Sequence, residues 1–403
     1  MLNNITHVRG FKCWGAHMGI KSKRRDIALI YSEVPASAAA VFTKNVVCAE
    51  PIKISREHIK DGIAQAFIVN SGNANACTGK QGWEGAVAMA ETTAAELNIA
   101  KTNVIVSSTG IIGEPFPTEK VLKGIKECVS KLSNREIAGS LTANAILTTD
   151  TFAKEGFTSF SIDDVQINMG GVAKGSGMIH PNMGTMLGFI VCDIAITPKL
   201  LDEALRKAVD KSFNMITVDG DTSTNDMVAI MCNGKAGNKE ITRKDARYNL
   251  FLANLEKLCT HLAKLIISDG EGSTKLIEYR TKGAKKETDA RQIVRTVSNS
   301  NLVKTAIFGS DPNWGRIIAA AGRSGIDFNP DHVDLYIGTE LGKMHEVVKQ
   351  GQPVPAIREQ LRKVMTSSTI IILIDLNIGD EEAVGWGSDF SYEYVRINAE
   401  YTT

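Results

Sequence analysis

The chain has 403 residues, more than one hydrophobic core usually organises, so its length predicts two domains or one large layered unit. Hydrophobic residues make up 43% and charged residues 23% of the sequence, fractions that are typical of a soluble globular protein. The 46 basic and 45 acidic residues leave a formal net charge of +1, which argues against a nucleic-acid-binding protein or a polybasic membrane surface.

The cysteines and the apolar segments favour a cytoplasmic location. The N-terminal residues contain no basic region followed by an apolar one, so we expect no secretory signal. The longest purely aliphatic run, residues 370–374, is too short to cross a bilayer. Seven cysteines are scattered without a Cys-x-x-Cys pair, which favours a reducing compartment over structural disulfides or a zinc site.

Short runs rich in β-branched residues alternate with amphipathic helical segments. In chain order we predict strands at 27–31 and 66–70, a helix at 85–99, a strand at 103–107, helices at 199–212 and 249–267, and strands at 333–337 and 369–374. Because strands and helices are mixed throughout, the fold class is α/β or α+β. The basic segment 275–300 is interpreted as the link between two lobes, which places a smaller α/β lobe at residues 281–403.

The standard motifs for cofactors and metals are missing. Residues 72–80 resemble a phosphate-binding loop, but six residues separate the glycines and Gln81 follows the lysine where Ser or Thr is required. No Gly-x-Gly-x-x-Gly follows a predicted strand, and neither His-Glu-x-x-His nor Gly-x-Ser-x-Gly occurs. The seven histidines are scattered; His180 alone lies beside an unusual loop, where a structural role is the simpler interpretation. We therefore expect neither a metal nor a cofactor.

Several glycine-rich or hydroxyl-rich segments lie beside predicted strands. At Thr109-Gly110 a strand ends on a hydroxyl and a flexible backbone, which suits an oxyanion hole or simply a turn. Residues 147–151 carry hydroxyls that can bind a ligand or cap a helix. Residues 218–226 are acidic and turn-rich, and an Asx-turn loop explains them better than a calcium loop. Lys174 is either a partner for a substrate carboxylate or a solvated side chain.

Gly184-Thr185 lies between a glycine-rich loop and an apolar strand-like run. Taken alone, the pair either forms an ordinary turn or contains a peptide bond at which the protein cleaves itself. A threonine freed at a new N-terminus carries its own base, because its α-amine accepts the hydroxyl proton directly or through water. The ordinary pKa of an α-amine is about 7.7–8, so a useful fraction of it is neutral near pH 7.

Together these segments resemble the ornithine acetyltransferase family, whose members are glutamate N-acetyltransferases and in some cases also amino-acid acetyltransferases. The similarity extends from residues 69–76 to the C-terminal residues 398–403 and is most specific over residues 174–187. Members of that family cleave themselves before the threonine of this stretch, so the resemblance implies a cut between Gly184 and Thr185. The family usually has alanine before that threonine; the glycine of this chain relaxes steric limits at the bond.

The resemblance also implies roles for single residues. It makes Thr185 the nucleophile and places Thr109 and Gly110 in the oxyanion hole. It implies substrate contacts from Thr148, Lys174, Thr185, Glu271, Asn398 and Thr403, with Thr149 as an alternative to its neighbour Thr148. The implied fold is a layered α/β sandwich with an N-terminal-nucleophile-like site. It is built from fragments 1–184 and 185–403, with residues 185–280 completing the main sandwich.

The reaction that the resemblance implies is a ping-pong transfer of acetyl from N2-acetylornithine to glutamate in arginine biosynthesis, which needs no cofactor. Members with and without acetyl-CoA as a donor share these motifs, so that point is open. The implied partners are the small-molecule substrates and the alpha and beta fragments themselves, two of each in a heterotetramer, without nucleic acid or membrane. The alternatives are a threonine amidase or aminopeptidase built on the same processed residue, and an unprocessed binding protein.

Overall fold

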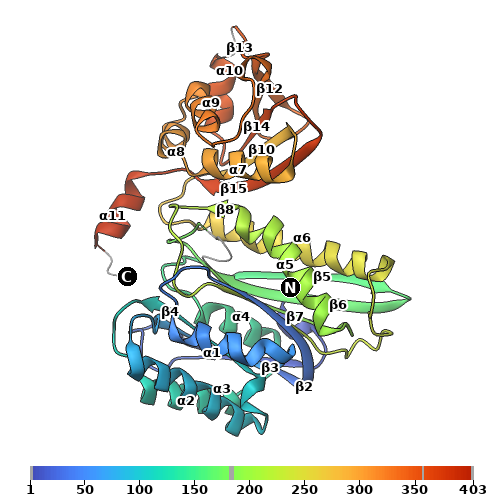
Figure 1. Ribbon diagram of the computed structural model, residues 1–403. Helices are drawn as coiled ribbons and strands as arrows, with labels where there is room; N and C mark the ends of the chain where they lie inside the picture. Colours follow the sequence, from blue (N-terminus) through green and yellow to red (C-terminus); the bar gives the residue numbers. More distant parts are fainter. Residues whose placement is uncertain (1–2, 181–185, 356–357, 401–403) are drawn as a thin grey trace.

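The computed structural model describes residues 3–180, 186–355 and 358–400. The chain forms two lobes, and Figure 1 shows the larger one below, in blue to yellow, with a smaller orange and red lobe above it. Among the described residues, no helix has the length and apolar character that a membrane crossing requires. The predicted residues Gly184, Thr185 and Thr403 lie outside the described ranges.

One continuous sheet forms the centre of the larger lobe. Its strands are β1 (Phe11–Ala16), β2 (Ile27–Phe42), β3 (Ile63–Asn73), β4 (Val104–Ile111), β5 (Lys154–Ile162), β6 (Val165–Lys174), β7 (Leu187–Cys192) and β9 (Met227–Cys232). Their order is β4-β3-β2-β9-β7-β6-β5, and β1 pairs with β2 outside this path. The sixteen-residue strand β2 pairs with β3 through residues 27–37 and with β9 through residues 37–42, with a register shift between Tyr31 and Ala36. The long strand therefore belongs to both halves of the sheet.

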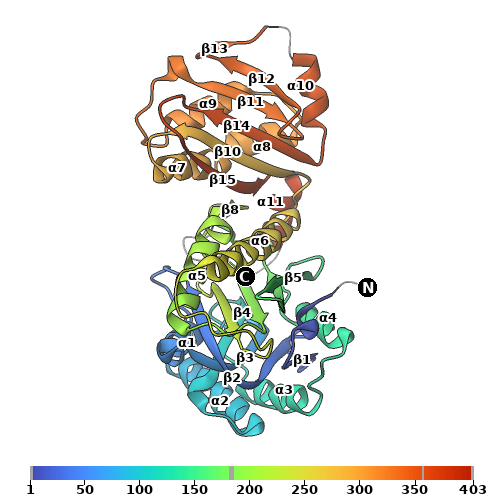
Figure 2. The same ribbon diagram turned by 90° about the vertical axis from the view of Figure 1, so that its right-hand side faces the viewer.

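Strands β1 to β4 form one half of this sheet, and strands β5, β6, β7 and β9 form the other. The two halves pack face to face. Phe67 on β3 and Phe189 on β7 meet across the sandwich with ring centroids 5.4 Å apart. Figure 2 shows the helices on the outer faces. The helices of this lobe are α1 (Glu50–His58), α2 (Gly79–Leu97), α3 (Thr118–Ser130), α4 (Glu136–Ala145), α5 (Pro198–Lys211) and α6 (Ala246–Ser268). The buried alanines of α4 belong to the cluster between the sheet halves, so α4 is not an outer helix. Helices α5 and α6 cover the half that contains β5 to β7, and α2 and α3 cover the half that contains β3 and β4.

Three buried clusters separate these four layers: one under α5 and α6, one between the sheet halves and one under α2 and α3. Burial of alternate residues on a strand and of one stripe on a helix produces this arrangement. The expected layered α/β sandwich is confirmed.

The smaller lobe is a second mixed sheet with its own helices. Its strands are β8 (Ile216–Thr217), β10 (Leu276–Ala284), β11 (Asp334–Gly338), β12 (Met344–Lys349), β13 (Gln352–Pro353), β14 (Thr369–Asp375) and β15 (Glu381–Ser388), in the order β13-β12-β11-β14-β10-β15-β8. The helices that follow β10 are α7 (Glu287–Ser298), α8 (Asn301–Phe308), α9 (Trp314–Gly322), α10 (Arg358–Met365) and α11 (Tyr392–Glu400).

Helix α11 returns from the smaller lobe to the larger one, as the red helix in Figure 1 shows. At its start, the Ser391 hydroxyl donates a 2.6 Å hydrogen bond to the backbone carbonyl of Gly272, just after α6. The short strand β8, which lies between α5 and β9 in the sequence, pairs with β15 at the edge of the second sheet. These two crossings bring the C-terminal helix beside the end of the main sandwich.

The predicted elements are all present, but the segment 275–300 is not a link. Residues 276–284 form the central strand β10, and residues 287–298 form α7. On β10, Ile277, Tyr279 and Thr281 are buried while the charged residues between them are not, so the basic residues belong to the outward positions of an alternating strand. The boundary placed at residues 280–281 therefore falls inside β10, and the second sheet already includes Leu276.

Candidate active site

A cavity of about 250 Å³ lies at one end of the main sandwich, where β4 and β6 end and β7 and β9 begin. All six predicted site residues that the structure describes line it: Thr109, Gly110, Thr148, Lys174, Glu271 and Asn398. Thr149 lines it as well, so the structure does not choose between Thr148 and Thr149. Met186, which follows the predicted nucleophile in the chain, is part of the same wall. Residues up to 289 positions apart in the sequence thus meet in one cavity.

Close contact between β3 and β4 fixes the conformation of Thr109-Gly110. Gly110 has φ +133°, and a Cβ on it would lie 2.4 Å from the carbonyl carbon of Gly72, so only glycine fits there. The side-chain amide of Asn225 donates to the backbone carbonyls of Ser108 (2.8 Å) and Ala74 (2.6 Å) and holds the end of both strands. The peptide that ends β4 is therefore held rigidly at the cavity wall.

Lys174 lies opposite this strand end, at the last position of β6. Its Nζ donates a 3.2 Å hydrogen bond to the Thr109 hydroxyl oxygen. Burial lowers the pKa of Lys174, and the nearby charge of Asp150 opposes this effect. Among the described residues no carboxylate lies within 4 Å of this ammonium. The alternative of a solvated side chain is thus excluded, because the residue is only 9% exposed.

A buried ion-pair network holds the loops around the cavity in place. Lys154 is completely buried and donates to Asp150 at 2.6 Å and to Asp269 at 2.5 Å. Asp150 also accepts the backbone N–H groups of Thr148 (2.9 Å) and Gly175 (2.7 Å). Although burial opposes ionisation, Lys174 and Lys154 lower the pKa of Asp150 to about 2. The network ties the loop after α4 to the end of β6 and to the end of α6.

The loop that leads to the predicted cleavage site is fixed by a second carboxylate. Asp219 accepts hydrogen bonds from the backbone N–H groups of Met178 (2.6 Å) and Ile179 (2.8 Å), and Met178 has φ +54°. The next residue, His180, lies between Thr217 (3.0 Å) and Arg295 of α7 (2.8 Å). Burial, and then the charge of Arg295, lower the pKa of His180 to about 4, so its ring is neutral near pH 7. This residue serves as an anchor for the loop.

Glu271 is an acidic residue of the same cavity wall. Its carboxylate accepts a 2.8 Å hydrogen bond from the side-chain amide of Asn398 on α11, and its backbone N–H donates to the Ser176 carbonyl. A Cβ on Gly177 would lie 2.4 Å from this carboxylate carbon, so the absence of a side chain at 177 lets Glu271 reach the cavity. Helix α11 thus positions a carboxylate that follows the C-terminal end of α6.

The acidic character of the cavity was not anticipated. Besides Glu271, its wall contains Asp219, Asp221 and Asp226, all from the segment 218–226 that the sequence favoured as a loop with Asx turns. Lys174 is the one basic residue among the described lining residues. Such an electrostatic balance favours ligands that carry an ammonium group. Asp150, Lys154 and Asp269 were also not predicted as site residues. Asp150 and Lys154 are only four positions apart, but Asp269, which completes the network, is 115 positions from Lys154.

Comparison with known proteins identifies the family. A model described as the ArgJ family matches residues 12–403. The arginine biosynthesis bifunctional protein ArgJ of Caldanaerobacter subterraneus subsp. tengcongensis is 48% identical, over 98% of this chain and 97% of that protein. The protein of the same name from Symbiobacterium thermophilum is 46% identical, over 100% of this chain and 99% of that protein. The chain belongs to the ArgJ family. It is an acyltransferase of arginine biosynthesis, as the sequence predicted.

Two solved structures of related proteins each match less than half of this ArgJ-family chain. ArgJ from Bacillus halodurans is 44% identical, with 45% of this chain and 94% of that chain covered and a TM-score of 0.44. An ornithine acetyltransferase from Mycobacterium tuberculosis, solved in complex with ornithine, is 34% identical, with 44% and 95% covered and a TM-score of 0.40.

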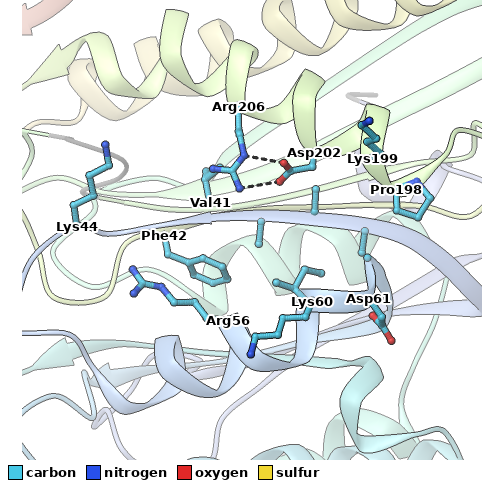
Figure 3. Close-up of a pocket in the computed structure, with 15 residues that line it drawn as sticks. Val41, Phe42, Lys44, Arg56, Lys60, Asp61, Pro198, Lys199, Asp202 and Arg206 are labelled. Carbon is cyan, nitrogen blue, oxygen red and sulfur yellow. Dashed lines mark hydrogen bonds and ion pairs between the residues drawn. The ribbon is translucent and has the colours of Figure 1, made fainter. Parts of the chain in front are cut away.

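A larger groove of about 740 Å³ lies elsewhere in the same lobe. It follows the second half of β2 between α5 and α1, where β2 has left β3 (Figure 3). Five cations line it together with two acids: Lys44, Arg56, Lys60, Lys199 and Arg206 with Asp61 and Asp202. The lining residues that the structure describes include no serine, threonine, cysteine or histidine. Without a nucleophile or a general base of these types, the groove does not suit acyl transfer, and the smaller cavity is the candidate active site of the ArgJ-family chain.

Proposed function

We propose that the chain cuts itself between Gly184 and Thr185, and that Thr185 then carries acetyl from N2-acetylornithine to glutamate. The observation that supports this most strongly is the shared cavity: six predicted site residues line it together with Met186, the residue after Thr185. At about 250 Å³ the cavity lies below the usual range of roughly 300–1,000 Å³ for drug-sized ligands, so it suits a small amino-acid derivative.

The hydrogen bond between Lys174 and Thr109 prepares the oxyanion hole. A lysine ammonium has donors only, so the Thr109 oxygen must accept the 3.2 Å bond. The Thr109 hydroxyl proton is then available for the oxygen of a bound acetyl group, and the Gly110 N–H supplies a second donor. Each such donor typically lowers the barrier of acyl transfer by roughly 3 kcal/mol. Lys174 thus acts partly through Thr109.

In the proposed catalytic cycle, the α-amine of Thr185 acts as the base for its own hydroxyl group. The Thr185 amine takes the hydroxyl proton as the oxygen attacks the acetyl carbonyl carbon, and the oxyanion forms between Thr109 and Gly110. The C–N bond then breaks, the ammonium returns the proton to the departing ornithine nitrogen, and an acetyl ester remains on Thr185. Glutamate enters, its neutral α-amine attacks the ester, and the threonine oxygen leaves with a proton. The products are ornithine and N-acetylglutamate.

Substrate recognition rests on opposite charges at the two walls. We assign the α-carboxylate of the substrate to the side of Lys174 and Thr148, and its ammonium to the acidic side around Glu271. Asn398 holds Glu271 in position through a 2.8 Å bond. Thr403 is assigned to the same site by the family resemblance. The same resemblance supports a cytoplasmic enzyme that contains two copies of each fragment. An assay with acetyl-CoA and glutamate tests separately whether acetyl-CoA is a second acetyl donor.

Intact-mass measurement and one assay test this proposal. The wild type should separate under denaturing conditions into fragments of 184 and 219 residues (403 − 184 = 219). Thr185→Ala should remain one chain and transfer no acetyl group. N2-acetylornithine is then supplied with and without glutamate. Ornithine release that does not depend on glutamate would support an amidase, and an active but uncut wild type would refute the threonine mechanism.

A further inference from the structure

Asp226 is a buried carboxyl group of the cavity wall to which the mechanism above gives no task. It is 2% exposed, precedes β9 directly and lines the cavity. Its Oδ2 atom is buried and has no hydrogen-bond partner among the described residues. Most buried polar atoms in proteins are paired, so an unpaired carboxyl oxygen beside a reactive site requires an explanation. Burial raises the pKa of Asp226 well above its ordinary value.

The strand register places Asp226 beside Met186, the first described residue after the predicted cleavage site. Strands β7 and β9 are parallel, with Leu187 opposite Met227, and the Met227 N–H donates a 3.0 Å bond to the Met186 carbonyl. Asp226 therefore lies beside Met186. Burial raises the pKa of its carboxyl group, and the Ser223 hydroxyl, the charge of Lys174 and the backbone N–H groups of Met186 and Ser223 oppose this effect without outweighing it. Met186 follows Thr185, and the nitrogens of neighbouring residues are about 3–4 Å apart by covalent geometry. The unpaired Oδ2 atom therefore belongs to a carboxyl group that adjoins the first described residue after the predicted cut.

Self-cleavage requires a proton to move between two atoms of one residue. As the Thr185 oxygen bonds to the carbonyl carbon of Gly184, its hydroxyl proton must leave. As the bond between that carbon and the Thr185 nitrogen breaks, the nitrogen must gain a proton. The α-amine that serves as base in the mature enzyme does not exist before the cut, because this nitrogen is still part of the peptide bond. The first reaction therefore needs another proton carrier.

We propose that the Asp226 carboxyl group moves this proton during self-cleavage. In its neutral form it protonates the departing Thr185 nitrogen, and as a carboxylate it takes the proton of the attacking hydroxyl, so the group ends as it began. The result is an ester between Gly184 and the Thr185 oxygen, which water hydrolyses to the Gly184 carboxylate and the free threonine. This inference rests on the proposed cleavage at Gly184-Thr185.

Asparagine at position 226 provides the direct test. Asp226→Asn keeps the shape and a polar group but carries no transferable acidic proton. We expect its self-cleavage, followed by intact mass after rapid purification, to be at least about 100-fold slower than that of the wild type. Its melting temperature should match that of uncut Thr185→Ala, because both chains are intact. Cleavage of Asp226→Asn at the wild-type rate would overturn the inference.

Glu155→Gln is the matched control. Glu155 on β5 also has a buried carboxyl oxygen without a partner, and burial raises its pKa, but it does not line the cavity. Its isosteric amide variant should cleave like the wild type. An uncut wild type would contradict the proposed function itself, whereas a cut wild type beside a normally cut Asp226→Asn contradicts only the role of Asp226.

Chemical rescue separates a proton carrier from a structural residue. Asp226→Ala leaves space for a small carboxylic acid next to the cleavage site. Sodium formate should accelerate its cleavage with a saturable dependence on concentration, while sodium chloride at the same ionic strength should not. A structural role would not respond to formate. Equal rates in both salts would count against proton transfer by Asp226.

Discussion

Two buried lysines on neighbouring strands have opposite surroundings. Lys154 on β5 pairs in register with Ala173, so it lies beside Lys174 of β6. Lys154 bonds to two carboxylates at 2.6 and 2.5 Å, whereas the one bond of Lys174 within the described part of the chain goes to a hydroxyl at 3.2 Å. The fully paired lysine holds loops together, and the other one faces the cavity. Buried charge that is incompletely paired costs stability, so its presence at a cavity indicates a chemical task.

The largest expected effect is on stability, at the paired lysine. Lys154→Met leaves Asp150 and Asp269 buried without their common cation. Breaking a buried ion pair on one side typically costs about 3–5 kcal/mol, so we expect a loss of that size in the free energy of unfolding, measured by denaturant titration.

A triple variant is the control for this prediction. Lys154→Met combined with Asp150→Asn and Asp269→Asn removes the charges on both sides and should recover part of the loss. A Lys154→Met variant as stable as the wild type would show that the network does not hold the cavity loops.

The second prediction concerns catalysis at the incompletely paired lysine. Lys174→Met should leave the free energy of unfolding unchanged or raise it, because a poorly compensated buried charge is removed. Without Lys174, the Thr109 hydroxyl is no longer oriented toward the acetyl oxygen, and kcat should fall about 100- to 1,000-fold. The assay is normalised to the cleaved fraction of each preparation.

Two further measurements test how Lys174 acts. If it acts through Thr109, the loss in Lys174→Met combined with Thr109→Val should be much smaller than the product of the two single losses. A rise of KM at unchanged kcat would instead mean that Lys174 only holds the substrate carboxylate.

Part of this contrast could be read from the sequence and part could not. Residues 174–187 are contiguous, so the predicted lysine and cleavage site could be found locally. Lys154 and Asp269 are 115 positions apart, and no spacing rule connects them. For Asp226 the acidic loop was visible, but its position beside Met186 depends on the parallel pairing of β7 and β9.

The fold shows the same division between local and long-range information. The first strand was predicted to end at residue 31, whereas β2 continues to Phe42. Pro35 interrupts the β pattern, and in the structure it lies where the register with β3 shifts, a position that tolerates proline. In β10, Ile277 and Tyr279 alternate with charged residues, a pattern that indicates a strand. The many basic residues of segment 275–300 suggested a linker instead, and the strand was missed.

The third prediction extends the comparison to a half-buried base, His180, which precedes the predicted cleavage site in the sequence. The pKa of His180 is lowered to about 4 in the fold, against 6.5 in an unfolded chain. As pH falls from 6.5 to 4, the unfolded chain therefore binds a proton that the folded chain does not. Stability should decline over this window, by at most about 3 kcal/mol from this residue. Thermal melts of wild type and His180→Gln should show a shallower decline for the variant, and parallel curves would contradict this origin.

The smallest effect is expected at an ion pair that is exposed rather than buried. In the basic groove, Arg206 meets Asp202 through two hydrogen bonds of 2.8 and 3.0 Å, and their side chains are 56% and 40% exposed (Figure 3). Because water screens this pair, Arg206→Ala should change the free energy of unfolding by less than about 1 kcal/mol and leave acetyl transfer unchanged. A clear loss of transfer would mean that the groove takes part in the reaction. The small cavity around Lys174 would then not be the whole of the active site.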